Sequence, residues 1–106
     1  MSTFDERERE FEARFRHDEE LAFKIRVRRD KLLGLWAAQH LGLKNGAADA
    51  YAKEVVEAEF SGPRGRGVVE KVTRDFAARS IAIDAARIED ELHRLGEEAR
   101  KQIEKS

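Results

Sequence analysis

The side chains that could bind a metal ion or transfer protons are histidines and carboxylates, and they cluster in two places. One is the run His-Asp-Glu-Glu at residues 17–20, and the other is the pair Asp90 and His93. Consecutive residues of a helix point in different directions, so the run cannot converge on one ion. The pair would be half of a di-iron bundle site, which needs two Glu-x-x-His motifs and two further glutamates. We therefore predict no metal site.

Covalent and phosphate-binding chemistry also lack their usual residues. There is no Cys, and Ser and Thr are few, so no nucleophilic triad can be assembled. The loop Gly-Pro-Arg-Gly-Arg-Gly at residues 62–67 lacks the Gly-Lys-Ser/Thr end of a P-loop and follows no strand. His17, His40 and His93 can titrate near neutral pH, but an exposed histidine without a role is the commoner case. We predict no catalytic residues and no enzymatic activity.

The charge balance narrows the classes of partner. The chain of 106 residues is long enough for one domain, and 21 Lys and Arg residues nearly cancel 22 Asp and Glu residues. Such a balance provides no general attraction for nucleic acid or for an anionic membrane. No stretch approaches the roughly 18 apolar residues of a membrane span, and the first ten residues do not form a secretory signal. We expect a cytoplasmic protein that is monomeric when free.

The composition and the breaks in the chain predict an all-α fold. Ala, Glu, Arg and Leu are abundant, there is one Pro, and Val and Ile never alternate with polar residues as in strands. Glycine and proline interrupt the chain near residues 42–46 and 61–67, and a third break falls at 79–83. We predict a four-helix bundle over residues 18–106. Its helices cover roughly residues 18–41, 47–60 and 67–78, and the last follows Asp84.

Apolar spacing predicts which face of each helix is buried. Asp84 is an N-cap candidate, and Ile83 and Ile88 have the spacing of a hydrophobic staple. The run at residues 32–38 is apolar most of the way round, which places the first helix at the centre, with Gly34 allowing close approach of a neighbour. The predicted stripes are as follows: Leu21, Ile25, Leu32 and Trp36; Ala48, Tyr51, Val55 and Ala58; Val69, Val72 and Phe76; Ile88, Leu92, Leu95, Ala99 and Ile103.

Residues 1–17 form an N-terminal arm of a different character. Its large apolar residues after Met1 are Phe4, Phe11 and Phe15, which lie within roughly 40° of one another on a helix. Pairs such as Asp5–Arg9 each support the helix by about 0.2–0.5 kcal/mol. We predict a mobile, helix-prone segment that orders on a partner with its rings as anchors. The alternative is that the rings extend the first bundle helix and pack on the domain.

Three stretches resemble a known family. Thr3-Phe4-Asp5-Glu6-Arg7-Glu8, with Phe11-Glu12, Phe15 and His17-Asp18-Glu19-Glu20-Leu21, is similar to the start of the zeta inhibitor subunit of bacterial, alphaproteobacterial-type F1-ATPases. So are Arg29-Asp30-Lys31-Leu32-Leu33-Gly34-Leu35-Trp36-Ala37-Ala38, where the family usually has Asn at position 30, and Ala50-Tyr51-Ala52-Lys53-Glu54-Val55-Val56. The loop at residues 62–67 and the last helix match only loosely.

The resemblance implies a function that periodicity cannot. It implies an inhibitor of ATP hydrolysis whose N-terminal segment inserts as a helix at an α/β catalytic interface of F1, with the α, β and γ subunits as partners, on the membrane-bound synthase. The implied contact residues are Thr3, Phe4, Asp5, Arg7, Glu8, Phe11, Glu12, Arg14 and Phe15. No cofactor is required, although the resemblance also implies weak binding of ATP or ADP at an unknown site. A helical bundle that senses adenine nucleotide is therefore the alternative function.

Overall fold

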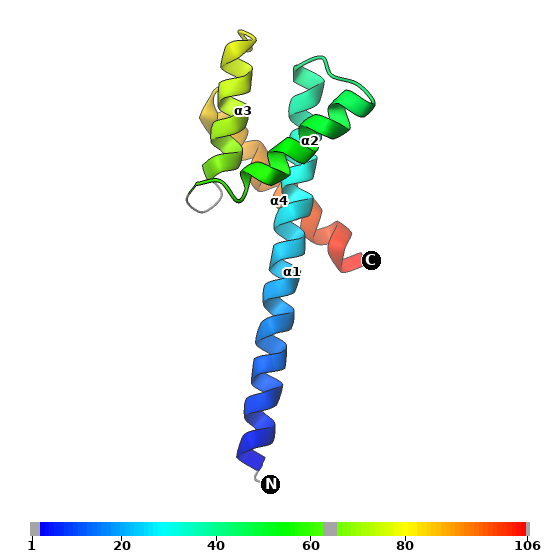
Figure 1. The fold of residues 1–106 in the computed structure, drawn as a ribbon, viewed down its shortest axis with the longest axis vertical. Coiled ribbons are helices and arrows are strands. Elements are labelled where there is room, and N and C mark those ends of the chain that lie inside the picture. Colours follow the sequence, from blue (N-terminus) through cyan, green and yellow to red (C-terminus); the bar gives the residue numbers. More distant parts are fainter. Residues whose placement is uncertain (1–2, 63–65, 106) are drawn as a thin grey trace.

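The structure, a computed structural model, describes residues 3–62 and 66–105 and contains four helices in those ranges. They are α1 (Thr3–His40), α2 (Gly46–Ala58), α3 (Arg66–Ala78) and α4 (Ala85–Lys105). The other three helices gather around the second half of α1, whose first half extends away from them (Figure 1). The molecule measures 65 × 27 × 20 Å, so it is elongated along this helix. The predicted all-α bundle is confirmed.

The first helix is longer than the sequence predicts for the bundle. α1 runs unbroken from Thr3 to His40, whereas we expected a bundle helix over roughly residues 18–41. No Gly or Pro lies between residues 3 and 33, so nothing in the chain interrupts the helix once it has formed. The domain boundary between residues 17 and 18 falls within this continuous helix and stays a prediction.

The turns have local causes that the sequence partly reveals. Gly42 follows α1 with a φ of 77°, and its N–H and that of Leu43 bond back to Gln39 and Ala38, as in a Schellman motif. The same pattern follows α3, where Ser80 has a φ of 56° and the N–H of Ile81 bonds to Phe76. At the start of α4, Asp84 Oδ1 accepts a hydrogen bond of 3.0 Å from the N–H of Arg87. The predicted cap is confirmed.

Close packing of α1 against α2 forms the centre of the bundle. Gly34 is buried in this contact, and a Cβ atom built on it would lie 2.5 Å from Ala52 Cα. The absence of a side chain therefore lets the two backbones approach, as predicted. The fully buried side chains around the contact come from all four helices, with Leu33, Val55, Val68, Val72, Phe76 and Ile88 among the largest.

The predicted central position of residues 32–38 is confirmed, but the predicted stripe is not the most buried side of α1. Leu21, Ile25, Leu32 and Trp36 are only half-buried, whereas Leu33, Ala37 and Ala38 are completely buried. Because α1 contacts all three other helices, it is buried on several sides. Its most extensive contact is with α2, so the side that faces α2 is shielded from water more completely than the predicted stripe. A smaller difference occurs in α3, where Val68 is fully buried and the predicted Val69 is half-buried.

Candidate functional site: the exposed half of the first helix

The first half of α1 touches none of the bundle core. Every residue from 5 to 20 is exposed. Phe11 is 70% exposed and Phe15 is 56% exposed, which are large values for aromatic side chains. The four-residue spacing places both rings on one side of the helix. The alternative that these two rings pack on the domain is therefore wrong for the free chain.

Most of the predicted contact residues lie together on this segment. Phe11 and Phe15 occupy one side of the helix, and the remaining described members are all exposed around them: Asp5, Arg7, Glu8, Glu12 and Arg14. The side chains of Thr3 and Phe4 lie outside the described part of the chain, as do Met1 and Ser2. The structure thus presents a helix with an aromatic side and a charged remainder, and their contacts with a partner stay a prediction.

The charged residues of this segment are solvated rather than paired. Among the described residues, the ion pairs shorter than 4.0 Å all involve residues from position 29 onward, so the predicted Asp5–Arg9 pair does not form, and neither do Glu10–Arg14 and Glu12–Arg16, which have the same spacing. Each exposed pair would gain only about 0.2–0.5 kcal/mol, little more than the side-chain entropy lost. These charges remain available to an incoming surface.

A groove lies between α1 and α4. It has a volume of about 1070 Å³ and lies beside the base of the exposed segment, where Leu21 and Ile25 of α1 face Leu92 of α4. Its charged lining mixes both signs, and includes Arg26, Arg29, Arg100 and Lys101 together with Asp18, Glu89, Glu97 and Glu104. Interleaved carboxylates oppose the binding of a polyphosphate, so no feature of this groove favours a nucleotide.

The described residues contain neither a cluster of metal ligands nor a membrane-spanning helix. No group of three or more His, Asp or Glu side chains there is arranged to hold a metal ion. The same ranges contain no helix whose length and apolar character would let it cross a lipid bilayer.

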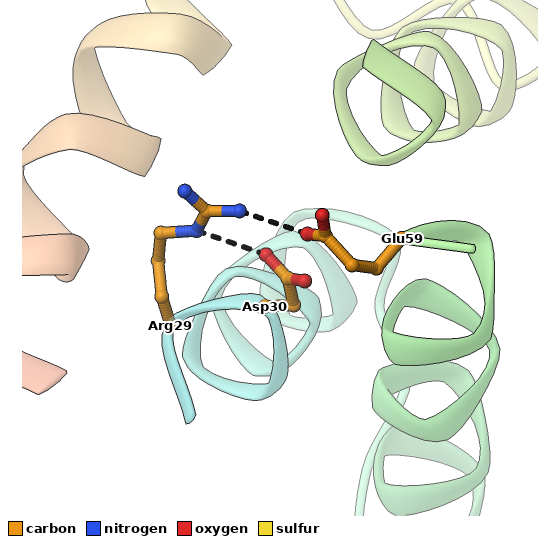
Figure 2. A network of polar contacts seen from close by, with 3 residues as sticks. All are labelled: Arg29, Asp30 and Glu59. Atoms are coloured by element: carbon orange, nitrogen blue, oxygen red, sulfur yellow. Dashed lines mark hydrogen bonds and ion pairs between the residues drawn. The ribbon is translucent and has the colours of Figure 1, made fainter. Parts of the chain in front are cut away.

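The bundle contains a buried ionic cluster that was not predicted from the sequence. Asp30 is fully buried where α1 meets the end of α2, and the Arg29 guanidinium bridges its carboxyl group to that of Glu59 (Figure 2). The spacing of residues could have indicated the burial of Asp30. It lies three residues before the buried Leu33 and seven before the buried Ala37, which places all three on the same side of the helix.

Comparison with known proteins identifies the chain. The family model described as ATPase inhibitor subunit zeta matches residues 1–102. The chain belongs to this family. The match covers the exposed half of α1 as well as nearly the whole bundle of this zeta chain. No curated protein matches the chain.

Membership of the zeta family establishes the general role of the protein. The chain is an ATPase inhibitor subunit, which is a regulatory protein with F1-ATPase as its partner. The identification agrees with the resemblance seen in the sequence and extends it over the last helix, which had matched only loosely.

Proposed function

We propose that this zeta chain inhibits ATP hydrolysis by inserting the exposed half of α1, as a helix, at an α/β catalytic interface of F1. This proposal rests mainly on the observation that α1 continues beyond the bundle as an unpartnered helix with exposed phenylalanine rings. Residues 5–20 would extend about 24 Å at 1.5 Å per residue, long enough to reach into a subunit interface. In this proposal the chain acts peripherally on the membrane-bound synthase, at its cytoplasmic side, and contacts the α, β and γ subunits.

The geometry favours insertion of a helix over insertion of an extended peptide. α1 is one helix from Thr3 to His40, so the bundle holds its C-terminal half and provides a template for the first half. A segment that is already helical loses less conformational entropy when it binds than one that orders at that moment. The bundle then stays outside the interface as the support for the inserting helix.

The two exposed rings would supply most of the affinity. A few buried aromatic anchors usually dominate an interface, and truncating one of them typically costs about 2–4 kcal/mol. The solvated charges near them, including Arg7, Glu8 and Arg14, would set the register and the sensitivity to salt. A phenylalanine that is 70% exposed in the free chain contributes little to folding, so binding and stability can be separated.

Phe11→Ala is the sharpest test of this proposal. We expect it to raise the concentration needed for half-inhibition of F1 by about 30-fold to 1000-fold, from a loss of about 2–4 kcal/mol. The stability of the bundle should change by less than about 0.5 kcal/mol. The assay is ATP hydrolysis by the cognate F1 with increasing amounts of each variant, together with thermal unfolding followed by circular dichroism.

A matched control is available in Phe60, which is 64% exposed but lies beyond α2. Phe60→Ala removes a ring of similar exposure, which contacts Phe23 of α1 with the ring centroids 5.9 Å apart, and should leave inhibition unchanged. A chain lacking residues 1–16 should not inhibit. The proposal fails if this truncated chain inhibits as well as the full chain, or if Phe11→Ala and Phe60→Ala weaken inhibition equally.

The alternative function, sensing of adenine nucleotide by the bundle, makes a different prediction. Binding of ATP or ADP would then survive removal of residues 1–16, because the bundle alone would hold the ligand. Titration of the truncated chain with millimolar nucleotide, followed by NMR chemical shifts, tests this directly.

A further inference from the structure

The buried cluster at the junction of α1 and α2 has an excess of negative charge. Asp30 has no exposed surface, and its Oδ1 accepts a hydrogen bond of 3.0 Å from Arg29 Nε. Arg29 Nη2 donates to Glu59 Oε1 at 2.9 Å, and the Glu59 side chain is only 10% exposed. One guanidinium therefore serves two carboxyl groups (Figure 2).

One oxygen atom of this cluster is left without a partner. Asp30 Oδ2 is buried and accepts no hydrogen bond from any described residue. An ionised carboxylate with such an oxygen would lose the solvation of its charge without compensation, which is strongly unfavourable. A protonated carboxyl group removes the net charge and turns an acceptor into a donor. The carboxylate of Glu59, which shares the Arg29 guanidinium with Asp30, is the neighbouring acceptor available to that donor.

The charges that act on Asp30 come from the two helices that meet there. They are Arg29, on α1 itself, and Glu59, at the end of α2. Burial, together with a hydrogen bond and repulsion from Glu59, raises the pKa of Asp30 to about 8, although Arg29 acts in the opposite direction. Arg29 remains charged at all relevant pH values, so the proton resides on the pair of carboxyl groups.

We propose that Asp30 is an uncharged carboxylic acid in the folded protein and joins α1 to the end of α2 by donating its proton to Glu59. The junction is thus a pH-sensitive contact that is complete in acidic and neutral solution and is lost when Asp30 ionises. This inference does not depend on the mode of inhibition of F1, since it concerns the bundle alone.

The sign of the pH dependence follows from proton linkage. Above pH 4 the unfolded chain releases the proton of Asp30 because an ordinary aspartate has a pKa near 3.9, whereas the folded chain retains it. Folding is therefore coupled to proton uptake, and stability falls as the pH rises toward the folded pKa of about 8. Above that value both states are ionised, and the dependence on this group levels off.

The direct experiment is an NMR titration of the full chain labelled with carbon-13 at the aspartate carboxyl groups. The resonance missing from Asp30→Asn identifies Asp30. We expect it to have the chemical shift of a protonated acid at pH 6 and to titrate with a midpoint near pH 8. In Glu59→Gln the midpoint should fall, because that variant removes a neighbouring negative charge. A midpoint at pH 4 or below in the wild-type chain would overturn the proposal.

Thermal unfolding provides an independent readout. Between pH 6 and pH 8 the melting temperature of the wild-type chain should fall by roughly 10 °C more than that of Asp30→Asn. All ionisable groups other than Asp30 are common to both proteins, so their effects cancel in this difference. Glu91→Gln is the matched control, because Glu91 is 6% exposed and pairs with Arg94, away from this junction. It should keep the wild-type pH dependence, and equal pH dependence in Asp30→Asn and the wild type would refute the inference.

Discussion

The close contact of α1 with α2 at Gly34 predicts that replacing glycine by alanine has opposite effects on stability at two helical positions, Gly34 and Gly96. A methyl group at position 34 would lie 2.5 Å from Ala52 Cα and 3.2 Å from Val55 Cβ. Carbon atoms at their optimum separation are about 3.5–4.0 Å apart, so the helices must move apart by about 1 Å to accept it. At Gly96 of α4 the same methyl group would lie 3.5 Å from Arg29 Cδ, an ordinary contact with a flexible side chain.

The magnitudes follow from two opposing effects. Overpacking of a close contact costs about 1–3 kcal/mol, and here the obstacle is backbone, so we take the upper part of that range. Replacing Gly by Ala within a helix gains up to about 1 kcal/mol. Gly34→Ala should therefore destabilise the protein by about 2 kcal/mol, and Gly96→Ala should stabilise it by up to about 1 kcal/mol. The corresponding melting temperatures should fall by about 10 °C and rise by several degrees.

Chemical denaturation with urea, followed by circular dichroism, measures both variants on the same scale. The midpoint should move to lower urea for Gly34→Ala and to higher urea for Gly96→Ala, with unchanged slopes. Inhibition of F1 by Gly34→Ala should be retained at temperatures where the variant is folded, because Gly34 is buried between α1 and α2. If Gly34→Ala is as stable as Gly96→Ala, the close approach of the two backbones is refuted.

Two further predictions concern the cap and the core. Asp84→Ala should lower the stability by about 1 kcal/mol, because Asp84 Oδ1 accepts the N–H of Arg87; urea denaturation alongside Asp90→Ala, an exposed change within α4, tests the cap. No difference between these variants would contradict it. Phe76→Ala should cost about 3–5 kcal/mol because this ring is fully buried, whereas Phe60→Ala, which removes the contact of an exposed ring with Phe23, should cost no more than about 1.5 kcal/mol. Similar melting temperatures for the two variants would show that burial has been misassigned.

Most of the helices and their ends could be predicted from the sequence because they depend on local interactions. Asp84 caps α4 through a backbone group three residues away, and Gly42 follows α1 with a positive φ that glycine adopts without strain. The close approach of a neighbouring helix at Gly34 was also predictable, because a glycine within an apolar helical run leaves space for another backbone. The arm was found by its narrow aromatic stripe, and the exposure of Phe11 and Phe15 agrees with that reading.

The tertiary structure alone decided how deeply each side of α1 is buried and which of its charged residues are covered. Burial depends on how many neighbours a helix has, and residues distant in sequence, such as Ala52 and Glu59, supply those neighbours. Asp30 illustrates the limit most clearly. Its position between the charged residues Arg29 and Lys31 suggests an exposed side chain. In the structure, however, the end of α2 covers Asp30 and makes its ionisation unfavourable. The sequence alone determined the helical segments and the unusual arm, because propensity and spacing are local, whereas the packing of α2 on α1 determined the environment of each charge.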